Sequence, residues 1–308
     1  MKVDCLCIGD IFFDFSIPLD DTRFRMIRGG TVNVRNLAFS PGGVGNIATM
    51  ISHLGSKSAF CGVIGDDALG YLYKKDLENN HVLPLLFTDR RRPTGQLLSL
   101  ISDDERSFIA CRGANDSLES NRVSTVIRRT SPTLVIVSGH SLSSRSMERI
   151  LLNAIRFARK SGIKVMFDCT PYNTIQLKRS IYRRVINNVD CLCLNIVEAK
   201  ALTGKDNIRE IIESLSDIVD ILALKMGKSG CIIATRKEIV RVNAPKVKVI
   251  DTTGAGDAFA AAIAYGIINN LPLSRMAKIA VRLSTEKVRN LGPRFYPPKS
   301  WIRDLLHQ

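Results

Sequence analysis

The chain has 308 residues, of which 45% are hydrophobic, so it is long enough and apolar enough to bury a sizeable core. No apolar run approaches the roughly 20 residues of a membrane helix. Residues 1–4 lead into a strand-like segment and not into a signal peptide, so we expect a cytoplasmic protein without a membrane partner. The net charge of +15 attracts anions, but the basic clusters are scattered and lack interleaved aromatics, which argues against a nucleic-acid partner.

The N-terminal third predicts short strands separated by turns. Strands are expected at 5–8, 12–17, 31–39, 58–64, 95–101 and 107–110. Ser40-Pro41-Gly42-Gly43 indicates a turn before a helix at 44–54, and a second helix is expected at 68–79. The strands without helices between them predict a small separate sheet, which would form a lid over a site at the edge of the main sheet.

From residue 134 onward, buried strands alternate with amphipathic helices. Strands are expected at 134–138, 164–168, 191–194 and 219–225, with an antiparallel pair at 232–234 and 239–242. Helices are expected at 144–160, 174–186, from 197, and at 207–215, 255–269, 274–289 and 301–307. Alternation of this kind requires a mostly parallel sheet that is covered by helices on both faces.

The cysteines look structural. Cys5 and Cys7, like Cys191 and Cys193, are spaced by two inside apolar runs, which places each pair on one face of a strand. The chain has no C-x-x-C pair and no nearby histidine cluster, so we expect core residues and neither a zinc site nor a disulfide framework.

The strongest chemical signal is the run Asp251-Thr252-Thr253-Gly254-Ala255-Gly256-Asp257-Ala258-Phe259. A strand end leads through small residues into an apolar helix, so backbone N–H groups approach an anion closely and the helix dipole stabilises its charge. Asp257 is placed to accept a proton from an attacking hydroxyl. It is equally well placed to cap the helix, and the spacing alone leaves both roles open.

This run resembles the C-terminal signature of the ribokinase-like (PfkB) carbohydrate kinase family. Further segments that resemble family motifs follow the family's order along nearly the whole chain: Gly9-Asp10-Ile11-Phe12-Phe13-Asp14, Pro41-Gly42-Gly43-Val44-Gly45-Asn46, Arg112-Gly113-Ala114-Asn115, Asn195-Ile196-Val197-Glu198-Ala199 and Lys225-Met226-Gly227-Lys228-Ser229-Gly230. The resemblance implies an α/β protein with the ribokinase-like three-layer α/β/α fold, a mostly parallel central sheet and a small β-sheet lid. It also implies one domain over 1–308, with lid strands from about 11–40 and 94–112.

The resemblance implies an ATP-dependent kinase that transfers the γ-phosphoryl group to a hydroxyl of a sugar or sugar derivative. Asp257 would be the general base, and Gly254, Ala255 and Gly256 the anion hole. The implied acceptor-binding residues are Asp14, Gly42, Gly43, Asn46, Arg112 and Asn115. The implied nucleotide-binding residues are Asn195, Glu198, Lys225, Gly227, Gly230 and Thr252. Glu198 would hold Mg²⁺ through water. Asp251 and Thr253 would hold K⁺, as in relatives that have the same residues in this signature.

The sequence departs from the family pattern in two places. Only Val44-Gly45 separates Gly43 from Asn46, where many sugar kinases have three residues. The segment after Asp168 reads Cys169-Thr170-Pro171-Tyr172 and lacks the asparagine and arginine often found there, which weakens the case for a nucleotide contact by Asp168.

Alternative functions remain at this point. Residues 43–48 fit G-x-G-x-x-A and Asp66 follows some twenty residues later, as in a dinucleotide-binding protein, but that reading leaves 254–257 without a role. A non-catalytic sugar- or nucleotide-binding protein is a second alternative, which the intact Asp257 argues against. Within the kinase hypothesis, a nucleoside acceptor, including pseudouridine, is the alternative to a sugar. Relatives pair through their lid sheets, so we expect a homodimer.

Overall fold

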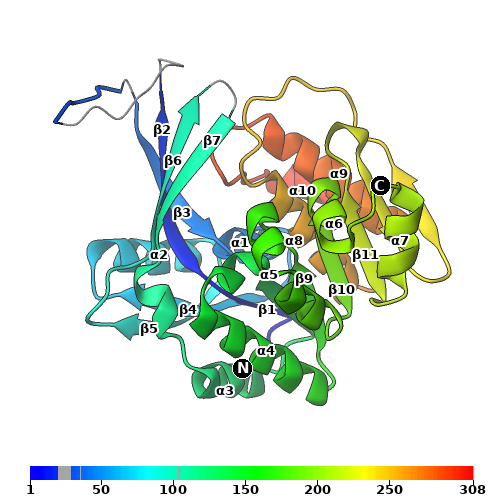
Figure 1. Ribbon diagram of the computed structural model, residues 1–308, viewed down its shortest axis with the longest axis horizontal. Coiled ribbons are helices and arrows are strands. Elements are labelled where there is room, and N and C mark those ends of the chain that lie inside the picture. Colours follow the sequence, from blue (N-terminus) through cyan, green and yellow to red (C-terminus); the bar gives the residue numbers. More distant parts are fainter. Residues whose placement is uncertain (20–28, 35, 103–104, 308) are drawn as a thin grey trace.

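The computed structural model describes residues 1–19, 29–34, 36–102 and 105–307, and within them it forms two sheets (Figure 1). The main sheet has the strand order β13-β12-β11-β10-β9-β8-β1-β4-β5. Its strands are β1 (Cys5–Ile8), β4 (Ser58–Gly65), β5 (Leu83–Asp89), β8 (Leu134–Ser138), β9 (Lys164–Asp168), β10 (Cys191–Asn195), β11 (Ile221–Lys225), β12 (Cys231–Ala234) and β13 (Ile239–Val242). The β11–β12 and β12–β13 pairings are antiparallel and the other described pairings of this sheet are parallel, so the predicted mostly parallel sheet is confirmed.

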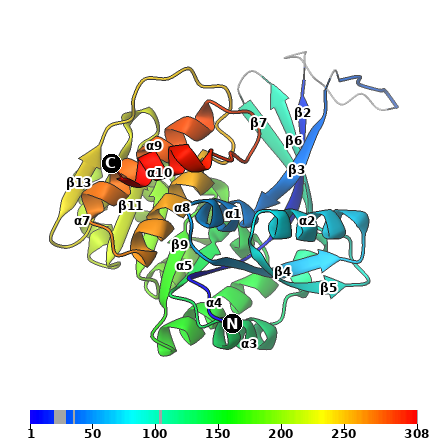
Figure 2. The same ribbon diagram turned by 180° about the vertical axis from the view of Figure 1, so that it is seen from behind.

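Helices cover both faces of this sheet, as Figures 1 and 2 show from opposite sides. One layer contains α3 (Ser120–Thr130), α4 (Arg145–Lys160), α5 (Tyr172–Ile186), α6 (Ile196–Thr203) and α7 (Ile208–Ser216). The other contains α1 (Gly45–His53), α2 (Ala68–Asn79), α8 (Ala255–Ile268), α9 (Leu273–Val288) and α10 (Lys299–His307). In the described part of the chain, no helix is both long enough and apolar enough to cross a bilayer.

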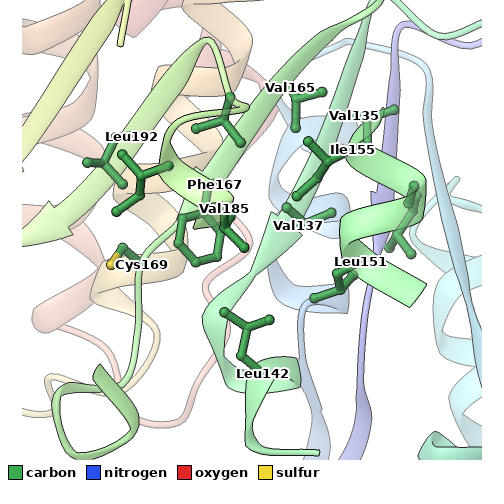
Figure 3. Close-up of a cluster of buried hydrophobic side chains, with 14 of the residues drawn as sticks. Val135, Val137, Leu142, Leu151, Ile155, Val165, Phe167, Cys169, Val185 and Leu192 are labelled. Atoms are coloured by element: carbon green, nitrogen blue, oxygen red, sulfur yellow. The ribbon is translucent and has the colours of Figure 1, made fainter. Parts of the chain in front are cut away.

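Strand alternation divides the core into two hydrophobic clusters. Leu6 and Ile8 face the α3–α7 layer, whereas Cys5 and Cys7 face the α8 layer. Figure 3 shows part of the first cluster, in which Phe167 of β9 lies among side chains from the strands and helices. Each fully buried large side chain stabilises the fold by about 1.5–3 kcal/mol. This packing holds the sheet in place, and with it the polar residues at the edge of the sheet.

A second, four-stranded sheet forms the lid and rises from the main sheet at the top of Figure 1. Its strands are β3 (Ala38–Gly43), β2 (Ile11–Pro18), β6 (Gln96–Ser102) and β7 (Glu105–Cys111), in that order. Strand β2 pairs parallel with β6, and the other neighbours are antiparallel. Because β1 ends only three residues before β2 begins, the lid stands directly beside the edge of the main sheet.

The strand predicted at 31–39 is wrong in its position. Strand β3 begins at Ala38 and includes the Ser40-Pro41-Gly42-Gly43 segment that was expected to be a turn. The register explains this, since Phe13 pairs with Pro41 and Ile11 with Gly43. Proline is tolerated because β3 is the edge strand of its sheet. Residues 20–28, 35, 103 and 104 of the predicted lid range lie outside the described residues.

Among the described strands and α-helices, one strand and one helix have no counterpart in the sequence prediction. Strand β5 contains Pro84, which argues against a strand, but β5 is the outermost strand of the main sheet and tolerates it. Helix α3 is rich in serine and arginine, yet Val123, Val126, Ile127 and Thr130 are buried at helical spacing. The edge position of β5 and the packing of α3 on the sheet therefore override the local composition of the two segments.

Candidate active site

Polar side chains gather at the carboxyl-terminal edge of the main sheet. The parallel strands β1, β8, β9, β10 and β11 end there, and they are closed or followed by Asp10, His140, Asp168, Asn195 and Lys225. The chain leaves β1 for β4 on one side and later returns as β8 on the other, so the strand order reverses at β1. Ligands of open α/β sheets bind beside such a point. The topology itself therefore places the candidate site.

The backbone conformation of the turn before α8 suits anion binding at the N-terminus of that helix. Gly254 is the N-cap with φ +76°, and a Cβ there would lie 1.8 Å from the carbonyl oxygen of Pro293, so only glycine fits. The amide of Ala255 donates to the carbonyl oxygen of Thr252 over 3.2 Å, which closes the turn. The positive end of the α8 dipole is thereby fixed next to the site.

Asp257 lies in the first turn of α8, and a side chain from α1 holds its carboxylate. Nδ2 of Asn46 donates to Oδ2 of Asp257 over 2.8 Å. Burial raises the pKa of Asp257 to about 6, although this hydrogen bond and the charges of Lys225 and Arg294 act to lower it. Such a carboxyl group is ionised at neutral pH and accepts a proton more readily than an exposed aspartate.

Arg294 is a site residue that sequence reasoning missed. Its Nε donates to Oδ1 of Asn46 over 2.8 Å, and its Nη1 is paired with Asp76 and donates to the hydroxyl of Tyr296 over 3.3 Å. Among the described residues, its buried Nη2 has no hydrogen-bond partner. Its side chain is only 7% exposed. Nothing in the tail sequence marks a buried arginine, because its partners Asn46 and Asp76 are more than two hundred residues away.

Asp14 of β2 approaches Gly42 of the neighbouring strand. A Cβ on Gly42 would lie 2.2 Å from Oδ2 of Asp14, so glycine is required for this approach. Burial and the charge of Asp257 raise the pKa of Asp14 to about 7, against the charge of Arg294. Its Oδ1 is buried, and within the described part of the chain it accepts no hydrogen bond. Asp14, Asp257 and Arg294 therefore share one electrostatic environment.

A second group of charges lies on the nucleotide side predicted from the sequence. Nζ of Lys225 is 3.1 Å from Oδ1 of Asp168. Burial acts to lower the pKa of Lys225, but the carboxylates of Asp168 and Glu198 raise it overall. A Cβ on Gly256 would lie 3.5 Å from the same ammonium, so Lys225 faces the turn at 254–256. The ammonium joins the strand edge to the start of α8.

Asn195 and Glu198 form a reciprocal cap at the start of α6. Oδ1 of Asn195 accepts from the amide of Glu198, and Oε2 of Glu198 accepts from the amide of Asn195, both over 2.8 Å. The two side chains thus cap the start of this helix. The cap engages one carboxylate oxygen of Glu198, Oε2.

The carboxyl groups beside this cap fit Mg²⁺. The residues Asp168 and Glu198 are buried, at 3% and 4% exposed. The single positive charge of Lys225 is shared between these two carboxyl groups. Burial raises the pKa of Glu198 overall, which means that Lys225 and the hydrogen bond from Asn195 compensate its ionised form only in part. Mg²⁺ commonly binds through one or two carboxylates and completes its shell with water and phosphate oxygens.

The remaining predicted nucleotide residues lie in different surroundings. Gly227 begins the short 3₁₀ turn at Gly227–Ser229 with no heavy atom within 4 Å of its hypothetical Cβ, so it borders open space. Gly230 instead lies against the carbonyl oxygen of Val242. Thr252 is exposed, next to the start of α8.

Two predicted acceptor residues are engaged inside the protein. Arg112 makes hydrogen bonds of 2.9 and 3.0 Å to the two oxygens of Asp10 and a third of 2.9 Å to Asp116. Asn115 accepts from the amide of Ile11 over 2.7 Å and donates to the carbonyl oxygens of Ile11 and Arg112. Asn115 thus clamps the start of β2. These contacts do not favour acceptor binding by either residue.

The carboxylate oxygens of Asp251, a predicted K⁺ residue, accept hydrogen bonds within the protein. Oδ1 of Asp251 accepts from the amide and hydroxyl of Thr253 over 2.8 and 2.7 Å, and its Oδ2 accepts from the amide of Gly292 over 2.8 Å. The ammonium of Lys287, which sequence reasoning also missed, lies 3.3 Å from the carbonyl oxygen of Asp251. Like charges repel, so this ammonium disfavours a second cation at the same carbonyl oxygen.

Comparisons with known proteins agree with this architecture. The model of the pfkB family of carbohydrate kinases matches residues 2–300. The ribokinase of Lactococcus lactis subsp. lactis is 27% identical over 284 residues, which cover 90% of this chain and 90% of that protein. The structure of an adenosine kinase from Sinorhizobium meliloti matches with a TM-score of 0.88 at 22% identity over 99% of both chains. An E. coli structure in complex with ATP and Mg²⁺ matches with a TM-score of 0.86 at 18% identity, again over 99% of both chains.

The family model covers nearly the whole chain, and the solved structures share its ribokinase-like fold. The chain belongs to the pfkB family of carbohydrate kinases.

Proposed function

We propose that the protein transfers the γ-phosphoryl group of ATP to a hydroxyl of a sugar or sugar derivative. The observation that carries this proposal is the position of Asp257, a carboxyl group with a pKa of about 6 in the first turn of α8, directly after the turn at 254–256. One element thereby offers a proton acceptor and an anion-binding helix start at the same place.

Asp257 is the general base in this proposal. At neutral pH its carboxylate is ionised and accepts the proton of the attacking hydroxyl as that oxygen bonds to the γ-phosphorus and the bond from this phosphorus to the oxygen of the leaving ADP breaks. Asn46 donates to Oδ2, so the carboxylate is held in one orientation before the acceptor binds. Preorganisation of this kind lowers the barrier because no rearrangement is needed during the reaction.

The turn at 254–256 and Lys225 stabilise the charge on the transferring group. The helix start directs its dipole at the phosphoryl oxygens, and the ammonium of Lys225 lies beside Gly256. Glu198, with Asp168 nearby, would hold Mg²⁺, which neutralises nucleotide phosphate charge when bound. The E. coli structure with ATP and Mg²⁺ supports this choice of donor.

Asp14 and Asn46 are the proposed acceptor contacts. The unpartnered Oδ1 of Asp14 accepts from a substrate hydroxyl, and Gly42 and Gly43 allow the acceptor close to the backbone. The ribokinase of L. lactis supports a sugar acceptor. A nucleoside is the second candidate, because Phe108 and Ile109 expose apolar surface on the lid and the adenosine kinase shares the architecture.

The lid also supports the proposal of a homodimer. Phe39, Phe108 and Ile109 are each more than half exposed, and β3 and β7 are the two edge strands of the lid sheet. Phe108→Lys is expected to convert the dimer to a monomer in light-scattering chromatography. An unchanged mass would exclude this part of the lid from the interface.

The test of the proposed function is a screen for ADP formation over sugars, sugar acids, sugar phosphates and nucleosides with Mg·ATP. A sugar-dependent rate with a phosphorylated product is the expected result. A rate with nucleosides alone would favour the second candidate. ATP consumption with none of the acceptors would contradict both.

A further inference from the structure

Lys287, in the last turn of α9, carries a buried positive charge. The residue is 1% exposed, and its Nζ donates to the carbonyl oxygens of Asn290 over 3.0 Å and of Asp251 over 3.3 Å. A lysine that is almost fully buried requires such partners, because an uncompensated ammonium is very costly away from water. Both of these acceptors are backbone oxygens, the ligand type that hard cations also take.

The two carbonyl groups belong to the two segments that meet beneath the catalytic turn. Asp251 precedes α8, and Asn290 follows α9. Further contacts join the same segments: Oδ2 of Asp251 accepts from the amide of Gly292, and Gly254 lies against the carbonyl oxygen of Pro293. Lys287 therefore lies where the segment before α8 contacts the segment after α9, and these contacts set the position of the 254–256 turn.

We propose that the ammonium of Lys287 takes the place of a bound monovalent cation, so that the catalytic turn is positioned without K⁺. This inference rests on the proposed function, because the turn it positions is the proposed anion hole. Lys287 is a positioning residue: it acts through the backbone of 251–254 and does not touch the reacting atoms. The predicted K⁺ role of Asp251 and Thr253 is thereby replaced by a side chain of the protein itself.

The proposal makes a direct statement about cation dependence. The wild-type rate is expected to be equal in KCl and in the chloride of a bulky organic cation at the same ionic strength, and so is the melting temperature. Strong activation of the wild type by K⁺ would overturn the proposal. The melting temperature does not depend on turnover, so its comparison in the two salts tests the proposal even if no acceptor is phosphorylated. Absence of phosphorylation would contradict only the proposed function.

Removing the side chain tests the site itself. Lys287→Ala leaves a space beside the carbonyl oxygens of Asp251 and Asn290 that K⁺ can enter. In the bulky organic cation, the variant is expected to lose at least about tenfold in kcat, and K⁺ is expected to restore both kcat and melting temperature. Lys278→Ala removes an exposed lysine of the same helix and is expected to show neither effect.

A second variant separates cation replacement from simple packing. Lys287→Met keeps most of the stem and fills the space, so we expect a loss of kcat that K⁺ does not restore. Restoration of Lys287→Ala by K⁺ together with an unrestored Lys287→Met supports the proposal. Full activity of Lys287→Met without K⁺ would show that only packing matters and would overturn it. If Lys287→Ala does not fold, the Lys287→Met result and the wild-type cation titration decide.

Discussion

The side-chain amide of Asn46 donates to Oδ2 of Asp257 over 2.8 Å and so joins α1 to α8 at the proposed base. The other end of the same amide accepts from Nε of Arg294 over 2.8 Å. Because an arginine is only a donor, it fixes which end of the Asn46 amide faces Asp257. A line of three side chains from distant parts of the chain thus orients the carboxylate.

Replacing Arg294 should shift the pH dependence of the reaction. Arg294→Met removes the donor to Asn46 and a positive charge that lowers the pKa of both Asp257 and Asp14. We therefore expect the acidic limb of kcat/KM against pH to move to higher pH. Arg209→Met, at an exposed arginine, is the control and should leave the profile unchanged. A lower rate with an unmoved acidic limb would contradict the electrostatic role.

The wild-type rate should fall as the pH is lowered through about 6. Burial raises the pKa of Asp257 to about 6, and only the ionised carboxylate accepts the hydroxyl proton. kcat/KM should therefore decrease about tenfold for each pH unit well below that value. A profile that stays flat from neutral pH down to the ordinary pKa of aspartate would show that Asp257 does not titrate in the rate-limiting step.

Stability should change in the opposite direction over the same range. The folded-state pKa values of Asp14 and Asp257 lie above their unfolded values, so the folded protein binds these protons more tightly. Their stabilising contribution is complete below the unfolded pKa and is lost as the pH rises through about 6 and 7. Melting curves of the unliganded protein between mildly acidic and mildly alkaline pH measure it.

Asp14→Asn isolates one of these groups. The neutral amide avoids burying an ionised carboxylate, so at mildly alkaline pH the variant should melt at least about 2 °C higher than the wild type. The difference should disappear in mild acid, where Asp14 is protonated. The KM for the acceptor should rise at the same time, since Oδ1 of Asp14 is a proposed contact. An unchanged KM would remove Asp14 from the acceptor site.

Glu198→Gln tests the metal side of the site. Glutamine preserves the hydrogen bond from the amide of Asn195, so the α6 cap should survive, but it removes the charge that would hold Mg²⁺. The Mg²⁺ concentration for half-maximal rate should increase. If the Mg²⁺ titration is the same as that of the wild type, Glu198 only caps the helix.

Much of the fold was predictable because it follows from local periodicity. The alternation of buried strands and amphipathic helices after residue 134 gave the parallel sheet and both helix layers, and the structure confirms them. The errors occurred where pairing partners decide. Strand β3 takes its limits from the register with β2, and β5 accepts Pro84 because it lies at an edge. One domain over 1–308 and a cytoplasmic location stay predictions.

Some residues of the candidate site were predictable from the sequence and others were not. Asp257, Asn46 and Asp14 stand in segments that resemble family motifs, and the structure brings them into one electrostatic environment. Arg294 and Lys287 carry no such mark. Their significance arises from burial and from partners that only the folded chain supplies, such as Asn46 for Arg294.

The most direct test of the central claim compares the wild type with Asp257→Asn in Mg·ATP-dependent phosphorylation of the best sugar acceptor. The variant keeps an oxygen for the Asn46 hydrogen bond but no longer accepts a proton, so folding and ATP binding should persist. Asp206→Asn, at a highly exposed aspartate, is the control. The account predicts that turnover falls by about 10²-fold or more in Asp257→Asn, and equal turnover of variant and wild type would contradict it.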